Sequence, residues 1–250
     1  ALALGYICDQ KTSERILRKI NSGDFFHADS LVTALSMNNP EKYRDLFEKI
    51  IKQPSYNEKS KAACIRALGK IGDTRAITFL TNQLNSARST TTRLDYQIPY
   101  IEAFGRIGGK DSIAILDSLF RLGNWETRSA VMRAYGNIND RAALVCILKS
   151  LEDKSGWVQL AALEGLAKYY NLHFKFLNTE KDLQFVGAIV NMLKKFKFNE
   201  VADKNTKEYE LISMLYAKVL EIHFTRIYLK HKDLAKKSAK SGGLKLKNSL

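Results

Sequence analysis

A short phrase of small and apolar residues recurs along this chain, and its clearest copy is Ala-Leu-Gly-Lys-Ile-Gly-Asp at residues 67–73. The aligned small residues of the successive copies are Gly5, Ser36, Gly69, Gly105, Gly136 and Ala167. They are 31, 33, 36, 31 and 31 residues apart. Self-similarity at such a period is typical of stacked helical pairs, because one pair alone cannot bury its apolar face. The sequence therefore predicts an all-α, α-α superhelix.

Residues 59–86 illustrate how the two helices of one repeat are built. Apolar residues at helical spacing predict a first helix whose last turn holds the small residue Gly69. Gly72 is suited to end this helix, and Asp73 is suited to cap the next one. The second helix presents one apolar stripe, formed by Ile77, Leu80 and Leu84.

Long polar residues occupy one further position in the register, before or at the start of each first helix. They are Lys61, Gln97, Arg128 and Gln159. Two interpretations are open for this position. It is either a solvated or helix-capping site, or a ladder of side chains that bond neighbouring repeats to one another.

These residues resemble the HEAT-repeat family, most nearly the short HEAT-like units that are also found in phycobilisome lyases. The resemblance covers residues 1–171. The family's Asp-x-x-Val-Arg start of the first helix survives in part at 124–128 and 155–159. The resemblance implies a solenoid of helical hairpins. It leaves the activity open, because HEAT units occur in scaffolds, transport receptors, lyases and a class of DNA glycosylases.

The periodicity weakens after Tyr170, and this predicts three regions. HEAT-like repeats occupy residues 1–171, with about five to six units and the first one truncated. Residues 172–229 form a C-terminal helical cap, with longer amphipathic helices at 183–196 and 209–228. Residues 230–250 are basic, small and polar, and we expect a flexible tail there.

The N-terminal residues are apolar and do not resemble the polar cap that a terminal repeat needs. They include Ala1, Leu2, Leu4 and Ile7. We therefore expect the chain to be part of a longer protein with at least one more helix upstream. The remnant of a signal peptide is an alternative. An uncapped first repeat also offers a surface for self-association.

Charge is the most marked compositional feature, since the chain has a formal net charge of +14. Residues 191–250 hold 14 Lys and Arg against 6 Asp and Glu. Such an excess indicates an acidic partner, whether nucleic acid, an anionic membrane surface or an acidic protein. It is equally compatible with a compositional bias that serves no partner.

Two further features of the sequence limit the class of protein. No apolar run approaches the roughly 18 residues of a membrane span. Three cysteines do not make a disulfide framework, and this favours a reducing cytosolic compartment.

Basic residues near the C-terminal ends of the predicted second helices are the first candidate site. They are Arg18, Lys19, Lys49, Lys52, Arg121 and Lys149. Cations there complement the helix dipole. If the second helices line the concave face, as is usual in HEAT stacks, these residues form an interrupted basic stripe for an acidic segment or a phosphate backbone.

The two tryptophans, Trp125 and Trp157, are the second candidate site, because both lie at the start of a first helix in adjacent repeats. Either they pack over a neighbouring repeat, or they form an anchor pair for a partner peptide. Tyr96, Tyr100 and the insertion at 86–93 are expected to border the same edge.

Catalytic patterns are hard to find in the sequence. The histidines are scattered, at His27, His173, His223 and His231. The chain has no His-Glu-x-x-His motif, no phosphate-binding glycine loop and no Gly-x-Ser-x-Gly elbow. The aspartate of HEAT-type glycosylases has no counterpart after Trp125. We therefore expect neither an enzyme nor a bound metal or cofactor.

The sequence thus favours a non-catalytic HEAT-repeat scaffold or adaptor that binds a protein partner through its concave face or loop edge. The alternative is a nucleic-acid-binding HEAT protein that uses basic concave residues and the tail. An enzyme of the glycosylase or lyase kind, and assembly through the first repeat, are further rivals.

Overall fold

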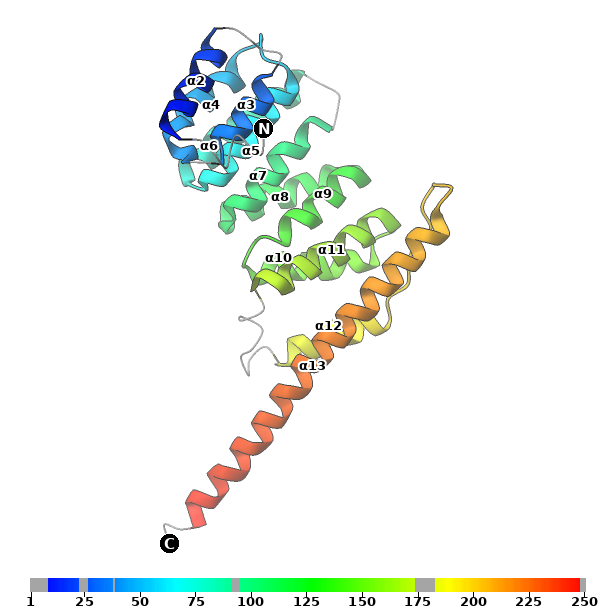
Figure 1. The fold of residues 1–250 in the computed structure, drawn as a ribbon. Coiled ribbons are helices and arrows are strands. Elements are labelled where there is room, and N and C mark those ends of the chain that lie inside the picture. The colour runs from blue at the N-terminus through cyan, green and yellow to red at the C-terminus, as the bar shows by residue number, and fades with distance from the viewer. Residues whose placement is uncertain (1–8, 23–26, 38, 91–94, 174–182, 248–250) are drawn as a thin grey trace. The chain divides into compact units, whose positions relative to one another are not determined.

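The computed structural model describes residues 9–22, 27–37, 39–90, 95–173 and 183–247. Within these ranges the chain forms twelve α-helices and three short 3-10 helices, and no strand (Figure 1). None of the helices described is both long enough and apolar enough to cross a membrane. The all-α solenoid fold that the sequence predicts is confirmed.

The chain divides into two compact units, Ala1–Ile138 (unit 1) and Asn139–Leu250 (unit 2). The described helices of unit 1 are α2 (Gln10–Asn21), α3 (Ala28–Leu35), α4 (Arg44–Lys52), α5 (Glu58–Ile71), α6 (Thr74–Thr90), α7 (Ile98–Ile107), α8 (Gly109–Leu122) and α9 (Trp125–Tyr135). Unit 2 contains α10 (Arg141–Lys149), α11 (Gly156–His173), α12 (Leu183–Lys194) and α13 (Thr206–Lys247). The 3-10 helices are η1 (Pro40–Tyr43), η2 (Asp95–Gln97) and η3 (Ser150–Glu152).

Polar caps set the ends of the helices in each hairpin. Asn57 caps α5 by accepting a hydrogen bond from the Ser60 amide at 2.8 Å. Gly72 ends α5 with a φ of +75°, a left-handed conformation that glycine adopts without strain. The Asp73 carboxylate then accepts from the Ala76 amide at 2.8 Å. The predicted roles of Gly72 and Asp73 are therefore confirmed.

The repeated glycine lies where one first helix crosses the next. A Cβ atom on Gly69 would lie 2.6 Å from the Cα of Ala103, and one on Gly105 would lie 2.7 Å from the Cβ of Ala134. These alanines begin the Ala-x-Gly phrase of the following repeat. The phrase recurs because each copy supplies both the glycine for one neighbour and the alanine for the other.

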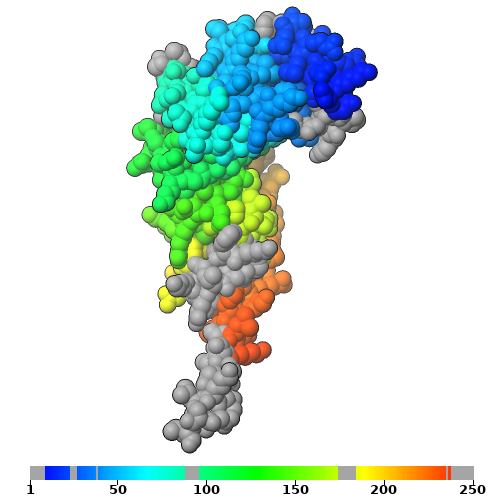
Figure 2. Space-filling view, turned by 90° about the vertical axis from the view of Figure 1, so that its left-hand side faces the viewer, coloured from blue at the N-terminus to red at the C-terminus, as the bar shows by residue number. Residues whose placement is uncertain are grey.

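The first helices α3, α5, α7 and α9 pack in succession, whereas α6 and α8 meet over a smaller area. Figure 2 shows the cyan surface of α5 and α6 continuing into the green surface of α7–α9. Glycine at the crossings lets the first helices approach one another closely.

The insertion that the sequence places at 86–93 is helical in its first part, because α6 continues to Thr90. Residues 91–94 lie outside the described residues, as do Ala1, Leu2, Leu4 and Ile7 of the expected uncapped repeat.

In unit 2, α13 packs against α11 and α12. Its inward face is formed by Ser213, Ala217, Leu220, Phe224 and Ile227, which are all buried. The Trp157 ring of α11 packs edge-on against Tyr209 of α13, with ring centroids 4.4 Å apart. These apolar contacts hold the long helix on the last hairpin.

The expected flexible tail from residue 230 needs correction, since α13 extends to Lys247. The residues after Tyr228 are rich in lysine, alanine and leucine, which are strong helix formers, and no proline interrupts them. Each therefore adds a backbone hydrogen bond to a helix that is already nucleated.

The long polar residues of the register do not share one role, as Gln159 and Lys61 show. The Gln159 side chain is 1% exposed. It donates to the carbonyl oxygens of Leu151 at 2.8 Å and Lys197 at 2.9 Å, and accepts from the Asn199 amide at 2.6 Å. Gln159 thus bonds separate segments of unit 2. Lys61, in contrast, pairs with Glu58 on its own helix at 3.4 Å.

Candidate functional site

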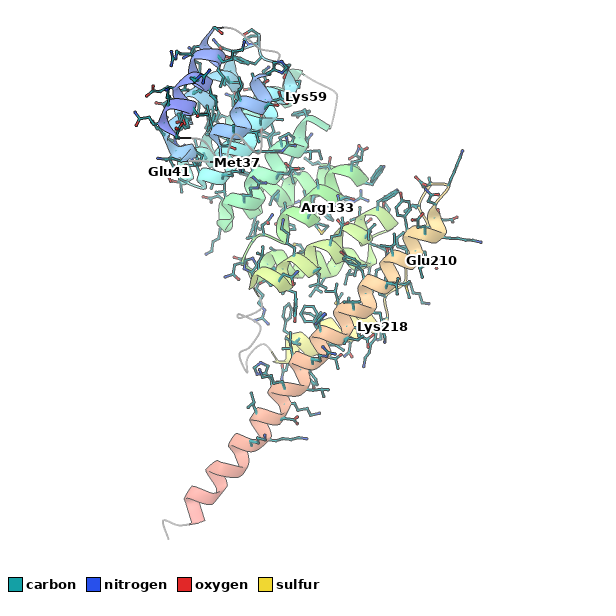
Figure 3. All side chains as sticks on the ribbon, viewed as in Figure 1. Met37, Glu41, Lys59, Arg133, Glu210 and Lys218 are labelled. Carbon is teal, nitrogen blue, oxygen red and sulfur yellow. The ribbon has the colours of Figure 1, made fainter. Side chains whose placement is uncertain are left out.

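A groove of about 1080 Å³ opens on unit 1, bordered by α3, α4, α5, α6 and α7. It lies at the edge where the second helices α4 and α6 end and the first helices α5 and α7 begin. Lys59, labelled in Figure 3, lies in the first turn of α5 beside it. Helix ends converge at this edge, so side chains that are distant in sequence share one surface.

The wall and floor of the groove combine aromatic and small apolar residues. Tyr96, Pro99 and Tyr100 come from η2 and α7, while Ala62 and Ala63 come from α5. Small residues on α5 leave room between the neighbouring helix ends. The buried hydroxyl of Tyr96 has no hydrogen-bond partner among the described residues, so a ligand acceptor or water is required to satisfy it.

The rim is mainly basic. Four cations line the groove, namely Lys52, Lys59, Lys61 and Arg66, against the carboxylates of Asp29 and Glu58. Arg66 also donates to Glu102 at 2.5 Å. The Lys52 ammonium lies 5.2 Å from the centroid of the Phe79 ring, in a cation–π contact. Because Lys61 pairs with Glu58 and Arg66 with Glu102, Lys52 and Lys59 supply most of the positive charge that favours an acidic ligand.

Tyr100 is held in its neutral form. Burial, with smaller contributions from the Glu58 carboxylate and Tyr96, raises the pKa of Tyr100 from 10 to about 12. The Tyr100 phenol is therefore protonated at neutral pH.

This raised pKa predicts a loss of stability at alkaline pH. The folded state favours the neutral phenol, so the stabilisation is present below pH 10 and is lost as the pH rises through about 12. Between these limits the wild-type protein should lose about 2–3 kcal/mol more free energy of unfolding than Tyr100→Phe. Urea unfolding of both proteins at several pH values measures this difference. Parallel curves would contradict it.

The basic residues that the sequence singled out all lie, exposed, in the last turns of helices, as expected for cations that complement the dipole. Arg18 and Lys19 end α2, Lys49 and Lys52 end α4, Arg121 ends α8 and Lys149 ends α10. Of these residues only Lys52 lines the groove.

The two tryptophans have different surroundings. Trp125 is the first residue of α9 in unit 1 and is 44% exposed. Trp157 belongs to unit 2, where its ring packs on Tyr209. Packing therefore accounts for Trp157, whereas Trp125 presents an aromatic surface to solvent.

Tyr96, Tyr100 and Ser86 line the same groove. The sequence predicts them at the edge that holds the two tryptophans, but neither tryptophan lines this groove. Lys59 and Arg66 were not predicted as site residues, because both belong to a first helix. Their signal in the sequence is the cations on both sides of Ala62 and Ala63 in α5.

Among the described residues, no group of three or more His, Cys, Asp or Glu side chains is placed to hold a metal ion. Cys64 is buried, and burial raises the pKa of its thiol.

The residues 60–86, comprising most of α5 and α6, match the family described as PBS lyase HEAT-like repeat. No curated protein matches the chain in sequence. Among solved structures, the chain is similar to human deoxyhypusine hydroxylase in complex with glycerol, with 12% sequence identity and a TM-score of 0.32. That alignment covers 87% of this chain and 88% of the human chain. Residues 60–86 therefore match one HEAT-like repeat, within a chain of recurring helical hairpins.

Proposed function

We propose that this protein is a non-catalytic scaffold whose groove in unit 1 binds an extended acidic segment of a partner protein. The observation that carries the proposal is the groove itself, where a basic rim surrounds an aromatic wall. A HEAT-like solenoid supplies a rigid frame for such a surface.

The chemistry of the groove matches an acidic peptide in two ways. Lys52 and Lys59 lie on the rim, where carboxylates of a partner retain water and each contact contributes at most about 1 kcal/mol. Tyr96 lines the groove, and its aromatic ring can pack against the aliphatic parts of a partner segment. An aromatic residue in such a position is a candidate hot spot, worth about 2 kcal/mol or more.

Nucleic-acid binding is the second candidate, and the net charge of +14 favours it. Lys230, Lys232, Lys236 and Lys237 add positive charge along the C-terminal part of α13. Contacts of this kind release counterions, so affinity falls linearly with the logarithm of salt concentration.

Peptide binding to the full chain tests the groove. One peptide that binds the full chain is first selected from a library of acidic peptides. Its affinity for each variant is then measured by fluorescence polarisation. Tyr96→Ala should weaken binding about 30-fold, and Lys59→Glu up to about fivefold. Both variants must retain the wild-type circular dichroism spectrum.

Lys110→Glu is the matched control for Lys59→Glu, because Lys110 is also an exposed lysine in a first turn but lies on α8, away from the groove. It should leave the affinity unchanged. Equal weakening by both charge reversals would contradict a defined groove. Competition by single-stranded DNA with a steep salt dependence would favour the second candidate.

A further inference from the structure

The long helix α13 carries an apolar stripe that no described element covers. Leu215, Ile222 and Leu229 recur every seven residues along it, and Leu211 and Val219 lie beside them. These five side chains are between 43% and 61% exposed. At 1.5 Å per residue the stripe is about 27 Å long.

This stripe is not the face that holds α13 on unit 2. The inward face consists of Ala217, Leu220 and Phe224 with their buried neighbours, which face α11 and α12. A monomer rarely exposes a continuous apolar surface of this kind, and such a surface usually marks an interaction site. The seven-residue spacing is that of helices which pair along their length.

We propose that the stripe pairs with the same stripe of a second copy of this chain, with the two α13 helices antiparallel. An antiparallel alignment that places Leu211 opposite Leu229 of the other copy makes two apolar layers, one near each end of the stripe. Between them it places Leu215 opposite Thr225 and Ile222 opposite Lys218. It brings Glu208 opposite Lys232 at both ends of the stripe.

The charges distinguish this arrangement from a parallel one. Glu208 and Lys232 are both exposed. Glu208 lies three residues before Leu211, and Lys232 lies three residues after Leu229. The antiparallel pair forms two Glu208–Lys232 contacts between copies, whereas a parallel pair places Glu208 against Glu208 and Lys232 against Lys232. Opposite charges therefore select the antiparallel alignment.

Lys218 provides a polar element within the stripe, opposite Ile222 in this alignment. Its ammonium donates to Glu221 of the same helix at 2.7 Å. Lys218 is labelled on α13 in Figure 3. The aliphatic part of the Lys218 side chain can lie along the apolar surface while its charge stays at the margin. A polar residue inside such a seam fixes the register at a cost in affinity.

Sedimentation equilibrium of the full chain tests the pairing. Over about 1–200 μM protein the wild type should shift from monomer to dimer, and Leu215→Glu should weaken the dimer at least about 100-fold. Leu172→Glu is the matched control, because Leu172 is 56% exposed on α11 and Leu215 is 57% exposed. A monomer at every concentration, or equal effects of the two substitutions, would overturn the proposal.

Charge reversal tests the alignment without altering an apolar residue. Glu208→Lys and Lys232→Glu should each weaken the dimer by about threefold to thirtyfold, because each replaces two attractions by repulsions. The double variant should recover wild-type affinity. Failure of the double variant to recover would overturn the antiparallel register, as would single reversals without effect.

Discussion

Gly105→Ala is expected to lower the free energy of unfolding of unit 1 by about 1–3 kcal/mol, as overpacking of a tight contact does. The added methyl group would lie 2.7–2.9 Å from the Cβ, Cα and carbonyl oxygen of Ala134. Two of these atoms belong to the backbone, so α7 and α9 must move apart. Helix propensity alone favours alanine over glycine by about 1 kcal/mol and would make Gly105→Ala more stable. A measured loss of stability therefore reports the close contact with Ala134.

Urea unfolding of four variants separates the contact from other causes. Combined with Ala134→Gly, the Gly105→Ala substitution should cost less than the sum of the two single effects, by at least about 0.5 kcal/mol. Gly109→Ala is the control for backbone strain alone, since Gly109 has a φ of +78° and no described atom within 4 Å of the added Cβ. A Gly105→Ala protein more stable than the wild type would contradict the close crossing.

Gln159→Ala should destabilise unit 2 by about 3 kcal/mol or more. The substitution leaves the Leu151 and Lys197 carbonyl oxygens and the Asn199 amide without their partner. Each buried backbone group that loses its hydrogen bond costs about 1–3 kcal/mol. Thermal and urea unfolding measure this loss, and a change below about 0.5 kcal/mol would contradict the role given to Gln159.

Gln159→Glu tests the same contacts by their dependence on pH. A carboxylate can accept from Asn199 but faces two carbonyl oxygens, so the folded state favours its protonated form. The folded-state pKa of the introduced group is then raised, and stability is lost as the pH rises from 5 to 8. The wild-type protein, measured in parallel, should lack this added loss.

The repeats could be predicted from sequence because each hairpin depends on local signals. Gly72 and Asp73 mark a helix end and a helix start through backbone conformation and capping, and both signals lie in adjacent residues. The recurring glycine predicts close packing, although its partner alanine in the next repeat becomes evident only in three dimensions.

The groove could be predicted only in part, because its residues come from several helix ends. The sequence placed Tyr96 and Tyr100 at one edge, but assigned the basic surface to the second helices. The groove takes side chains from first and second helices alike, and which of them meet there depends on how successive hairpins pack. Lys59 and Arg66 on α5 were therefore overlooked.

The role of the long polar residues illustrates the same limit. Lys61 and Gln159 occupy equivalent positions in the sequence, yet one forms an ion pair within its own helix and the other joins three segments. The difference arises from the segment at Lys197 and Asn199, which bonds Gln159. A tertiary neighbour about 40 residues away decides the environment.

Photo-crosslinking in a lysate of the source cells tests most directly whether the groove binds a protein partner. A photo-reactive phenylalanine derivative replaces Lys59 in one sample and Lys110 in the other, with and without nuclease. We predict a defined protein adduct at position 59 that survives nuclease, is absent at position 110 and is lost with Tyr96→Ala. Equal adducts at the two positions, or adducts that nuclease removes, would contradict partner binding in the groove.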